Sequence, residues 1–436
     1  ITGQGRSNMG IVNATGCTSV WGSTYPINPY PFPWANHLFQ DSPSVAMGLF
    51  EGHMQKMAEG FKYIRMAQHE IDSPAEELDL TYFTWKDFSD EEWLLCPPVV
   101  AVGGDGAMYD IGFQNLSRML MSGKPIKTMV VDTQVYSNTG GQACTSGFIG
   151  QISDMATFGN VNQGKQEHRK EMGLIGFAHR TSYILQSSSA SPPHLIEGFI
   201  EGLNSRRPAL FNIYTACQPE HGIADDISYD QAKLALESRA YPFVRYNPDR
   251  GNMPSECFDL DGNPEIELDW PKYPLRYLDD DGKECSMELA MTFADFAASE
   301  ARFRKHFKEA PRDTWDDETM IPIEEYLNLD DEGREDVFPF VWTINDEQQL
   351  RRTLMTQDIV DSTIERLNNW RLLKGLAGLD VEELDEASIA DNVRSDMISR
   401  ITGSLVRMAT SDEDEDDSDS SSETKTLPIP NLEVGS

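Results

Sequence analysis

Basic residues are scarce in this sequence. Lysine and arginine number 36 against 72 aspartates and glutamates, which gives a formal net charge of −36 at pH 7. Because nucleic-acid binding depends on basic patches that neutralise phosphates, this balance argues against DNA or RNA as a partner. An acidic surface of this kind is typical of a well-solvated protein, and it attracts basic partners over long range.

Cysteines are also few. None of them forms a CxxC pair, so their spacing by itself indicates neither a zinc site nor a redox motif. Taken singly, a cysteine is most often a small buried hydrophobic residue, and in the cytoplasmic setting that we expect, disulfides are not predicted. The six are Cys17, Cys96, Cys144, Cys217, Cys257 and Cys285.

Long hydrophobic runs are missing as well. No stretch reaches the roughly 18 apolar residues of a transmembrane helix, and no secretory signal is visible, so we expect a protein without membrane contact. The sequence has no G-x-S-x-G nucleophile elbow and no histidine spacing typical of zinc sites. It begins with Ile1 rather than Met, and we expect it to be a piece of a longer chain.

The most informative segment of the sequence spans residues 99–142. Val99–Val102 is a short β-branched run that stops at a Gly-Gly-Asp-Gly turn, residues 110–121 have helical periodicity, and 126–131 is typical of a second buried strand. Such a βαβ unit places its two strands side by side and parallel, with both following loops at their carboxyl ends. Ligands of open α/β sheets bind at that end.

The two loops carry oxygen donors. Asp105 lies among glycines that let the backbone approach a ligand closely, and the second loop offers the Thr133 hydroxyl, exposed carbonyls and the Asn138 amide. Magnesium takes hard oxygen ligands, usually one or two carboxylates completed by substrate phosphates and water. Either loop alone is typical of an ordinary turn, but the pair predicts a magnesium–diphosphate site.

These motifs resemble a known family. Gly-Asp-Gly at 104–106, followed by DTQVYSNTGGQ at 132–142, is similar to the thiamine-diphosphate domain of pyruvate:ferredoxin oxidoreductases. Three further blocks resemble that family in the same order: ATGCTSVWG at 14–22, PWANHLFQD at 33–41 and YTACQPEHG at 214–222. The likeness is dense over about the first 240 residues. It implies oxidative decarboxylation of a 2-oxoacid, most simply pyruvate, to acetyl-CoA and CO2, with electrons passing through iron–sulfur clusters to ferredoxin or flavodoxin.

The resemblance also implies roles for individual residues. Asp105, Thr133 and the backbone carbonyl of Val135 would bind Mg²⁺, and Asn138 would face the reacting ring of thiamine diphosphate and the bound 2-oxoacid as a catalytic residue. His37 is more typical of an ordinary loop histidine than of a rim residue. The other residues expected to line the cofactor are Cys17, Gly104, Gly106, Ala107, Gln134, Tyr136 and Ser137.

Cys17 and Cys217 correspond to two of the four cysteines that hold a [4Fe–4S] cluster in the resembled family. The other two ligands are expected upstream of residue 1. The pyrimidine-binding domain, with the glutamate that activates thiamine, and the coenzyme A and ferredoxin-like domains are also expected upstream or on a partner chain. We therefore expect an incomplete enzyme that works with those domains, as a homodimer.

The pattern of elements predicts three parts. Strands alternate with helices over residues 1–240, which indicates an α/β domain with a mostly parallel sheet flanked by helices. Residues 241–410 change to a β-hairpin over 273–289, an amphipathic helix over 289–307 and a mostly helical segment over 346–376, which together form a C-terminal α+β extension. Residues 411–436 are acidic and serine-rich, a composition that predicts disorder.

Two other functions are compatible with parts of the sequence. A non-oxidative thiamine-diphosphate decarboxylase would explain the diphosphate loops but not Cys17 and Cys217. A non-catalytic interaction subunit with a relic thiamine fold would use its acidic tail to dock a partner, but the intact Asp105, Thr133 and Asn138 argue against it.

Overall fold

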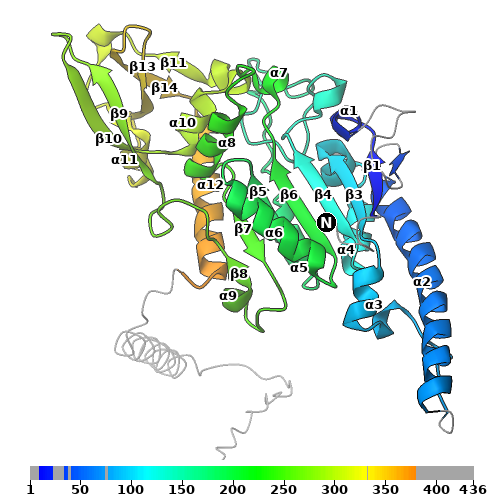
Figure 1. The fold of residues 1–436 in the computed structure, drawn as a ribbon. Helices are drawn as coiled ribbons and strands as arrows, with labels where there is room; N and C mark the ends of the chain where they lie inside the picture. The colour runs from blue at the N-terminus through cyan, green and yellow to red at the C-terminus, as the bar shows by residue number, and fades with distance from the viewer. Residues whose placement is uncertain (1–8, 23–33, 38–40, 74–76, 331, 380–436) are drawn as a thin grey trace, which may run out of the picture. The chain divides into compact units, whose positions relative to one another are not determined.

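The structure is a computed structural model of the chain, and it describes residues 9–22, 34–37, 41–73, 77–330 and 332–379 (Figure 1). The chain divides into two compact units, residues 1–380 and 381–436. The second unit, with the predicted acidic tail, lies outside the described residues. The predicted boundary at residue 240 stays a prediction.

A mixed sheet of eight strands forms the centre of the first unit, in the order β2-β1-β3-β4-β6-β5-β7-β8. The six strands from β2 to β5 in that order are parallel, and β7 and β8 are antiparallel to their neighbours. This confirms the predicted fold class. The strands are β1 (Gly10–Ala14), β2 (Trp34–His37), β3 (Val99–Gly104), β4 (Lys127–Asp132), β5 (Tyr183–Ser188), β6 (Ala209–Tyr214), β7 (Val244–Tyr246) and β8 (Phe258–Asp259).

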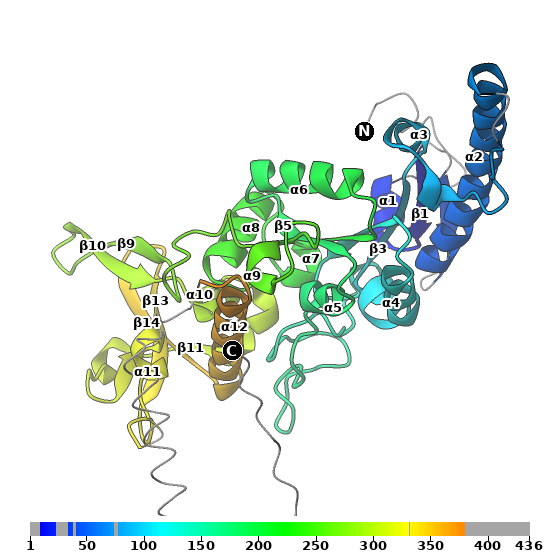
Figure 2. The ribbon, with the colours of Figure 1, turned by 90° about the horizontal axis from the view of Figure 1, so that it is seen from below.

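Helices cover both faces of this sheet. Residues alternate between the two faces of a strand, and Gly176 of α5 (Met172–Ala178) lies against Ile184 whereas Gly198 of α6 (Pro192–Asn204) lies against Leu185, so these helices lie on opposite faces (Figure 2). The long helix α2 (Ser42–Asp72) and α4 (Phe113–Met121) share the α5 side, in one hydrophobic cluster with Ile184.

The helix predicted between the two key strands differs in its first turn. Residues Gly106–Asp110 form a π-helical turn, and α4 begins only at Phe113. A π turn holds more residues than an α turn, so it rotates the helix face relative to the predicted one. Of the four apolar residues that give 110–121 its helical pattern, Leu116 and Leu120 are buried, but Ile111 is 49% exposed and Met121 is 57% exposed. The four therefore do not share one buried face.

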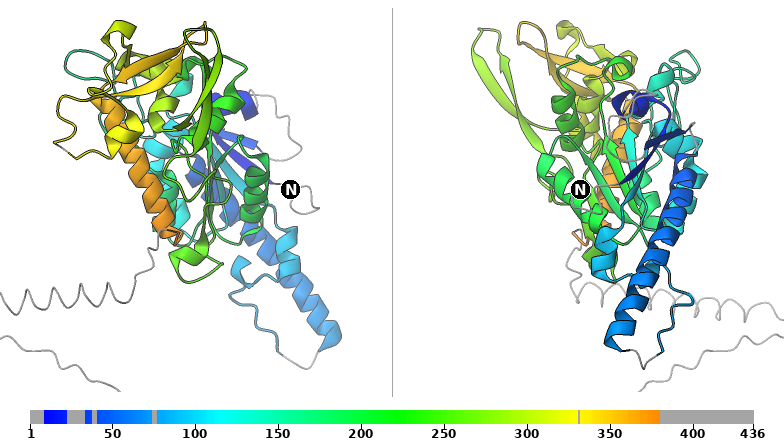
Figure 3. Two further views of the ribbon diagram at one scale, coloured as in Figure 1. Left: turned by 90° about the vertical axis from the view of Figure 1, so that its left-hand side faces the viewer. Right: turned by 45° about the vertical axis from the view of Figure 1, so that its right-hand side comes forward.

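The C-terminal extension contains the predicted hairpin, β9 (Lys272–Leu278) with β10 (Glu284–Ala290), and a second sheet in the order β11-β14-β13-β12. Figure 3 shows both next to the central sheet. The strands of the second sheet are β11 (Phe307–Glu309), β12 (Met320–Pro322), β13 (Phe338–Ile344) and β14 (Leu350–Met355).

Two helices expected in the extension are shorter than predicted. Residues 289–307 form only α10 (Phe293–Ala298) and a 3-10 turn (Ala301–His306). The segment 346–376 begins as β14 and becomes helical only in α12 (Gln357–Leu376). The inward residue of β14 is Arg352, whose guanidinium lies over the rings of Trp315 and Trp342, so the buried side of this strand carries a charge and hides the usual alternation of apolar residues.

The remaining helices are short and connect these layers. No helix in the described ranges is long and apolar enough to cross a membrane. These helices are α1 (Cys17–Gly22), α3 (Asp90–Leu95), α7 (Gln218–His221), α8 (Ser228–Glu237), α9 (Pro254–Cys257) and α11 (Ile323–Leu327).

Candidate functional site

A pocket opens where β1, β3 and β4 end, at the carboxyl edge predicted from the βαβ unit. It brings together every predicted cofactor residue except Gln134, which is buried behind it, and Cys217. The lining consists of Thr15, Gly16, Cys17, Thr18, Gly104, Asp105, Gly106, Ala107, Val131, Thr133, Val135, Tyr136, Ser137, Asn138 and Thr139.

Asp105 lies at the base of this pocket, only 2% exposed. One carboxylate oxygen accepts hydrogen bonds from the Thr133 amide, at 2.9 Å, and from the Thr133 hydroxyl, at 2.6 Å. The other accepts from the Gln134 amide, at 2.9 Å, and from the Ser146 hydroxyl. The loop after β4 therefore wraps around the side chain that follows β3.

The three predicted magnesium ligands converge. The Thr133 hydroxyl lies 2.6 Å from the Asp105 carboxylate, 3.0 Å from the carbonyl oxygen of Val135 and 2.8 Å from the Ser137 hydroxyl. A carboxylate, a hydroxyl and a carbonyl within hydrogen-bond reach of one another form an all-oxygen donor set of the kind that Mg²⁺ prefers.

The electrostatics of Asp105 favour a cation. Burial, and after it the nearby charge of Asp132, raises the pKa of the Asp105 carboxyl from 3.8 to about 8, although its hydrogen bonds lower it. A bound cation would hold this carboxyl ionised. The described residues contain no cluster of three or more His, Cys, Asp or Glu side chains suited to a metal, so a cation here would depend on neutral oxygens and ligand phosphates as well.

Gly106 leaves room for the Tyr136 ring beside the turn after β3. A Cβ atom on this residue would lie 2.2 Å from the ring of Tyr136, closer than any real contact. The close approach lets the turn after β3 pack directly against the loop after β4. This is the steric reason for a glycine after Asp105.

Asn138 and Cys17 stand at the exposed rim of the pocket. The Cys17 sulfur lies 4.0 Å from the Asn138 side-chain oxygen. Burial raises the pKa of the Cys17 thiol, and the nearby charges of Cys217, Asp105 and Glu220 raise it further. Cys17 begins α1 after β1, and Cys217 precedes α7 after β6, so the two predicted cluster ligands both follow carboxyl ends of parallel strands although they are far apart in sequence.

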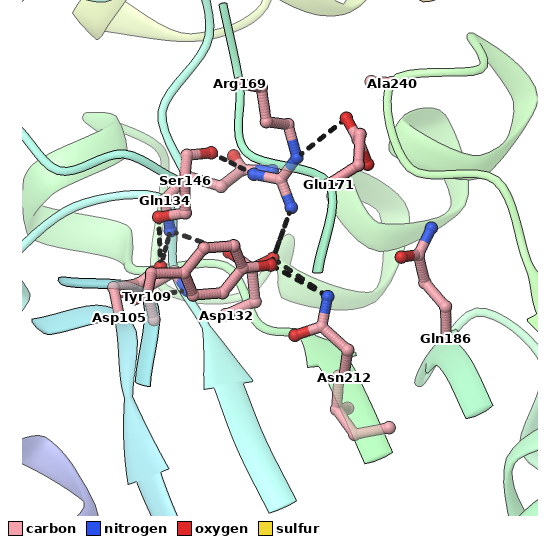
Figure 4. Close-up of polar contacts among 12 residues, drawn as sticks. Asp105, Tyr109, Asp132, Gln134, Ser146, Arg169, Glu171, Gln186, Asn212 and Ala240 are labelled. Carbon is pink, nitrogen blue, oxygen red and sulfur yellow. Dashed lines mark hydrogen bonds and ion pairs between the residues drawn. The ribbon is translucent and has the colours of Figure 1, made fainter. Parts of the chain in front are cut away.

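A buried ionic network lies behind the pocket, and the sequence did not predict it. Figure 4 shows Arg169 between Asp132, Ser146 and Glu171. Its guanidinium pairs with the Asp132 carboxylate, which also accepts a 2.6 Å hydrogen bond from Tyr109, and it donates to the Ser146 carbonyl. The sequence offered one weak signal for this network, because Arg169 belongs to the short basic segment 165–170. In the structure Arg169 is buried.

His37 does not line the pocket. It ends β2, is exposed, and its Nδ1 lies 3.2 Å from the Asp41 carboxylate. This fits the ordinary loop histidine expected from the sequence.

Comparison with known proteins also indicates a thiamine-diphosphate-binding domain. Residues 94–213 match the family described as thiamine pyrophosphate enzyme, C-terminal TPP binding domain. The pyruvate:ferredoxin oxidoreductase of Moorella thermoacetica is 28% identical over 296 residues, covering 58% of this chain and 25% of the relative. The pyruvate-flavodoxin oxidoreductase of Klebsiella pneumoniae is 26% identical over 346 residues, covering 70% and 27%.

One further relative and one solved structure are also similar to part of the chain. The pyruvate dehydrogenase [NADP(+)] of Cryptosporidium parvum is 27% identical over 319 residues, covering 55% of this chain and 16% of the relative. A solved structure of 2-oxoglutarate:ferredoxin oxidoreductase from Magnetococcus marinus, with 2-oxoglutarate, coenzyme A and succinyl-CoA bound, is 15% identical with a TM-score of 0.35, covering 52% and 59%. A likeness at that TM-score says nothing further about this chain.

The chain thus spans about a quarter of the length of the first two relatives. The family match includes both pocket loops, from Gly104–Ala107 to Thr133–Asn138. The resemblance seen in the sequence is confirmed: this chain is related to the pyruvate:ferredoxin and pyruvate-flavodoxin oxidoreductases, to their thiamine-diphosphate-binding portion.

Proposed function

We propose that this chain is the thiamine-diphosphate- and magnesium-binding part of a 2-oxoacid:ferredoxin oxidoreductase that acts on pyruvate. The observation that carries the proposal is the convergence of Asp105, the Thr133 hydroxyl and the Val135 carbonyl at the base of one pocket. These three oxygens would hold magnesium, which would supply the positive charge that a bound diphosphate needs. Gly104–Ala107 and Thr133–Asn138 would line the cofactor.

When bound, thiamine diphosphate supplies the electron sink for decarboxylation of a 2-oxoacid. The residues of this chain hold and orient the reactants. Asp105 and Thr133 fix the diphosphate end at the buried base of the pocket. Asn138, at the exposed rim, can donate its amide hydrogens to the carboxylate or the ketone oxygen of the 2-oxoacid and so orient it.

Cys17 and Cys217 would supply two thiolates of a [4Fe–4S] cluster beside the pocket. Their placement supports this role, because both cysteines follow carboxyl ends of parallel strands and Cys17 lies on the pocket wall. The cluster would pass electrons singly toward ferredoxin or flavodoxin, and coenzyme A would take the acyl group. Two further thiolates, and the group that activates the aminopyrimidine ring, would come from domains outside these residues or from a partner subunit.

Cluster assembly and electron transfer test the proposal together. The complete assembly that contains this chain is purified without oxygen and assayed for pyruvate-dependent ferredoxin reduction with Mg²⁺, thiamine diphosphate and coenzyme A. Cys17→Ser and Cys217→Ser are each expected to lower the iron content and ferredoxin reduction while CO2 release survives better. Cys285→Ser, a half-buried cysteine in β10, is the matched control and is expected to change neither.

The same assay separates the alternatives. Pyruvate decarboxylation with full rates in both cysteine variants and no iron would favour a non-oxidative thiamine enzyme. Failure of the intact assembly to bind thiamine diphosphate at all would favour a non-catalytic subunit.

A further inference from the structure

Gln134 stands between the two residues that offer neutral oxygens to the proposed metal, Thr133 and Val135. Its backbone is left-handed, with φ +62°. Residues other than glycine rarely adopt this backbone conformation, and it persists only where surrounding contacts hold it. What holds Gln134 therefore decides where the Thr133 hydroxyl and the Val135 carbonyl point.

Both peptide groups of Gln134 are held from within the α/β domain. Its amide donates to the Asp105 carboxylate at 2.9 Å, and its carbonyl accepts from the Gln151 side chain at 2.8 Å. The residue is completely buried. Its side chain cannot, therefore, turn outward to find water, and it needs a partner inside the protein.

That partner comes from the C-terminal extension. The Arg302 guanidinium donates to the Gln134 side-chain oxygen at 2.7 Å, across 168 residues of sequence. Arg302 is 4% exposed and is itself held by an ion pair of 2.5 Å to Glu300. Its carbonyl oxygen accepts from the Ile152 amide at 3.0 Å, which ties the 3-10 turn to the loop that follows the pocket.

Glu300, which directly precedes this turn, reaches the Thr133–Gln134 peptide group through His221. The imidazole Nε2 lies 2.8 Å from the Thr133 carbonyl oxygen, an acceptor, so this nitrogen carries the hydrogen. Nδ1 of the same ring lies 3.3 Å from a Glu300 carboxylate oxygen. Arg302 thus contacts the Gln134 side chain, and Glu300 lies beside the imidazole that bonds to the Thr133–Gln134 peptide group.

We propose that Arg302 is a positioning residue of the metal site: it holds Gln134 in its left-handed conformation and so directs the Thr133 and Val135 oxygens toward Asp105. The C-terminal extension is then part of the cofactor site, although it lines none of the pocket. This inference rests on the proposed function, because it concerns the site for magnesium and thiamine diphosphate. It adds a residue that neither loop motif contains.

The test is a titration of the complete assembly with magnesium at saturating thiamine diphosphate. Isothermal calorimetry measures the magnesium affinity. Arg302→Met keeps the side-chain volume but removes the donors, and we expect the magnesium affinity to fall about tenfold or more. Gln134→Met is expected to cause a similar loss. Because the two residues act through one contact, the double variant is expected to be no weaker than either single variant.

A second arginine of the extension provides the control. Arg352 is similarly buried, at 7% exposed, but its guanidinium contacts Asp316 and Asp317 and not the 133–135 loop. Arg352→Met is expected to lower the melting temperature while the magnesium affinity stays unchanged. A general loss of stability would instead weaken magnesium binding in both arginine variants.

The outcomes are distinct. Unchanged magnesium affinity in Arg302→Met, or additive losses in the double variant, would overturn this inference alone and leave the proposed function standing. If Arg302→Met does not fold, Arg302→Lys and Gln134→Met decide the question by the same measurement. Absence of magnesium-dependent cofactor binding in the unaltered protein would overturn the proposed function and this inference with it.

Discussion

Two buried aspartates stand at the ends of neighbouring strands, and the protein surrounds them differently. Asp132, at the end of β4, pairs with the Arg169 guanidinium and accepts a hydrogen bond from Tyr109. Asp105, just after β3, accepts hydrogen bonds from neutral amides and hydroxyls, and no ion pair to it exists in the described part of the chain. One carboxylate is balanced inside the protein, and the other faces the pocket without a cation.

The difference separates a structural charge from a functional one. Burying an ion pair is tolerated because the partners neutralise each other, whereas a buried charge without a partner is costly and shifts its pKa instead. The pKa of about 8 for Asp105 records that cost. Under the proposed function magnesium supplies the counter-charge of Asp105. Removing the Asp105 charge should therefore impair cofactor binding, whereas breaking the Asp132–Arg169 pair should impair stability.

The largest effect is expected at Asp105. Asp105→Asn keeps the shape but removes the charge and one acceptor, so magnesium-dependent binding of thiamine diphosphate should fall below detection by calorimetry. The variant should still fold, at a cost of about 1–3 kcal/mol for a buried amide hydrogen left without an acceptor. Cofactor affinity equal to that of the unaltered protein would show that Asp105 is not a metal ligand.

Arg169 should behave in the opposite way, through stability. Arg169→Met leaves the Asp132 carboxylate buried without its counter-ion, which typically costs about 3–5 kcal/mol. The matched control is Arg371→Met, which removes an ion pair between an exposed arginine and Asp269 and should cost less than about 1 kcal/mol. Urea unfolding of both variants measures the difference, and equal losses would refute the structural role of the Arg169 pair.

A further effect is a pH dependence specific to Asp105. Because its folded pKa of about 8 lies above its ordinary value of 3.8, the folded state holds a proton that the unfolded state releases between those values. Its contribution to stability is therefore fully present below about pH 4 and is lost as the pH rises through about 8. Magnesium must displace this proton, so its affinity should rise about tenfold per pH unit up to about pH 8 and then level off.

Calorimetry in two buffers of different ionisation enthalpy measures that proton. We expect about one proton to be released per magnesium bound near pH 6 and none near pH 9, after subtraction of the protons released by magnesium and thiamine diphosphate alone. Release that does not change with pH would mean that Asp105 is already ionised before the metal binds.

The position of Asp105 at the edge of the sheet could be predicted from the sequence, because the signals for it are local. A β-branched run, a Gly-Asp-Gly turn and a second strand place Asp105 and Thr133 at one edge of a parallel sheet, and the structure has both there. The π-helical turn after Asp105 was missed, because nothing in the residue pattern distinguishes it from the start of an α-helix.

The buried contacts of Arg169 and Arg302 could not be predicted, because their partners come close only in the folded chain. Arg169 reaches Asp132 across 37 residues, and Arg302 reaches Gln134 across 168. No periodicity links such pairs. The left-handed backbone of Gln134 was also unpredictable, since most left-handed positions are marked by glycine, asparagine or aspartate and this one is held by tertiary contacts.

The most direct test of the metal site replaces magnesium with manganese. Electron paramagnetic resonance of the assembly with Mn²⁺ and thiamine diphosphate should show hyperfine coupling to the diphosphate phosphorus, because Asp105 would hold the ion next to the diphosphate. The coupling should disappear from the protein-bound signal in Asp105→Asn and persist in Arg371→Met. An unchanged phosphorus coupling in Asp105→Asn would contradict the account, because the metal would then bind the cofactor without the Asp105 carboxylate.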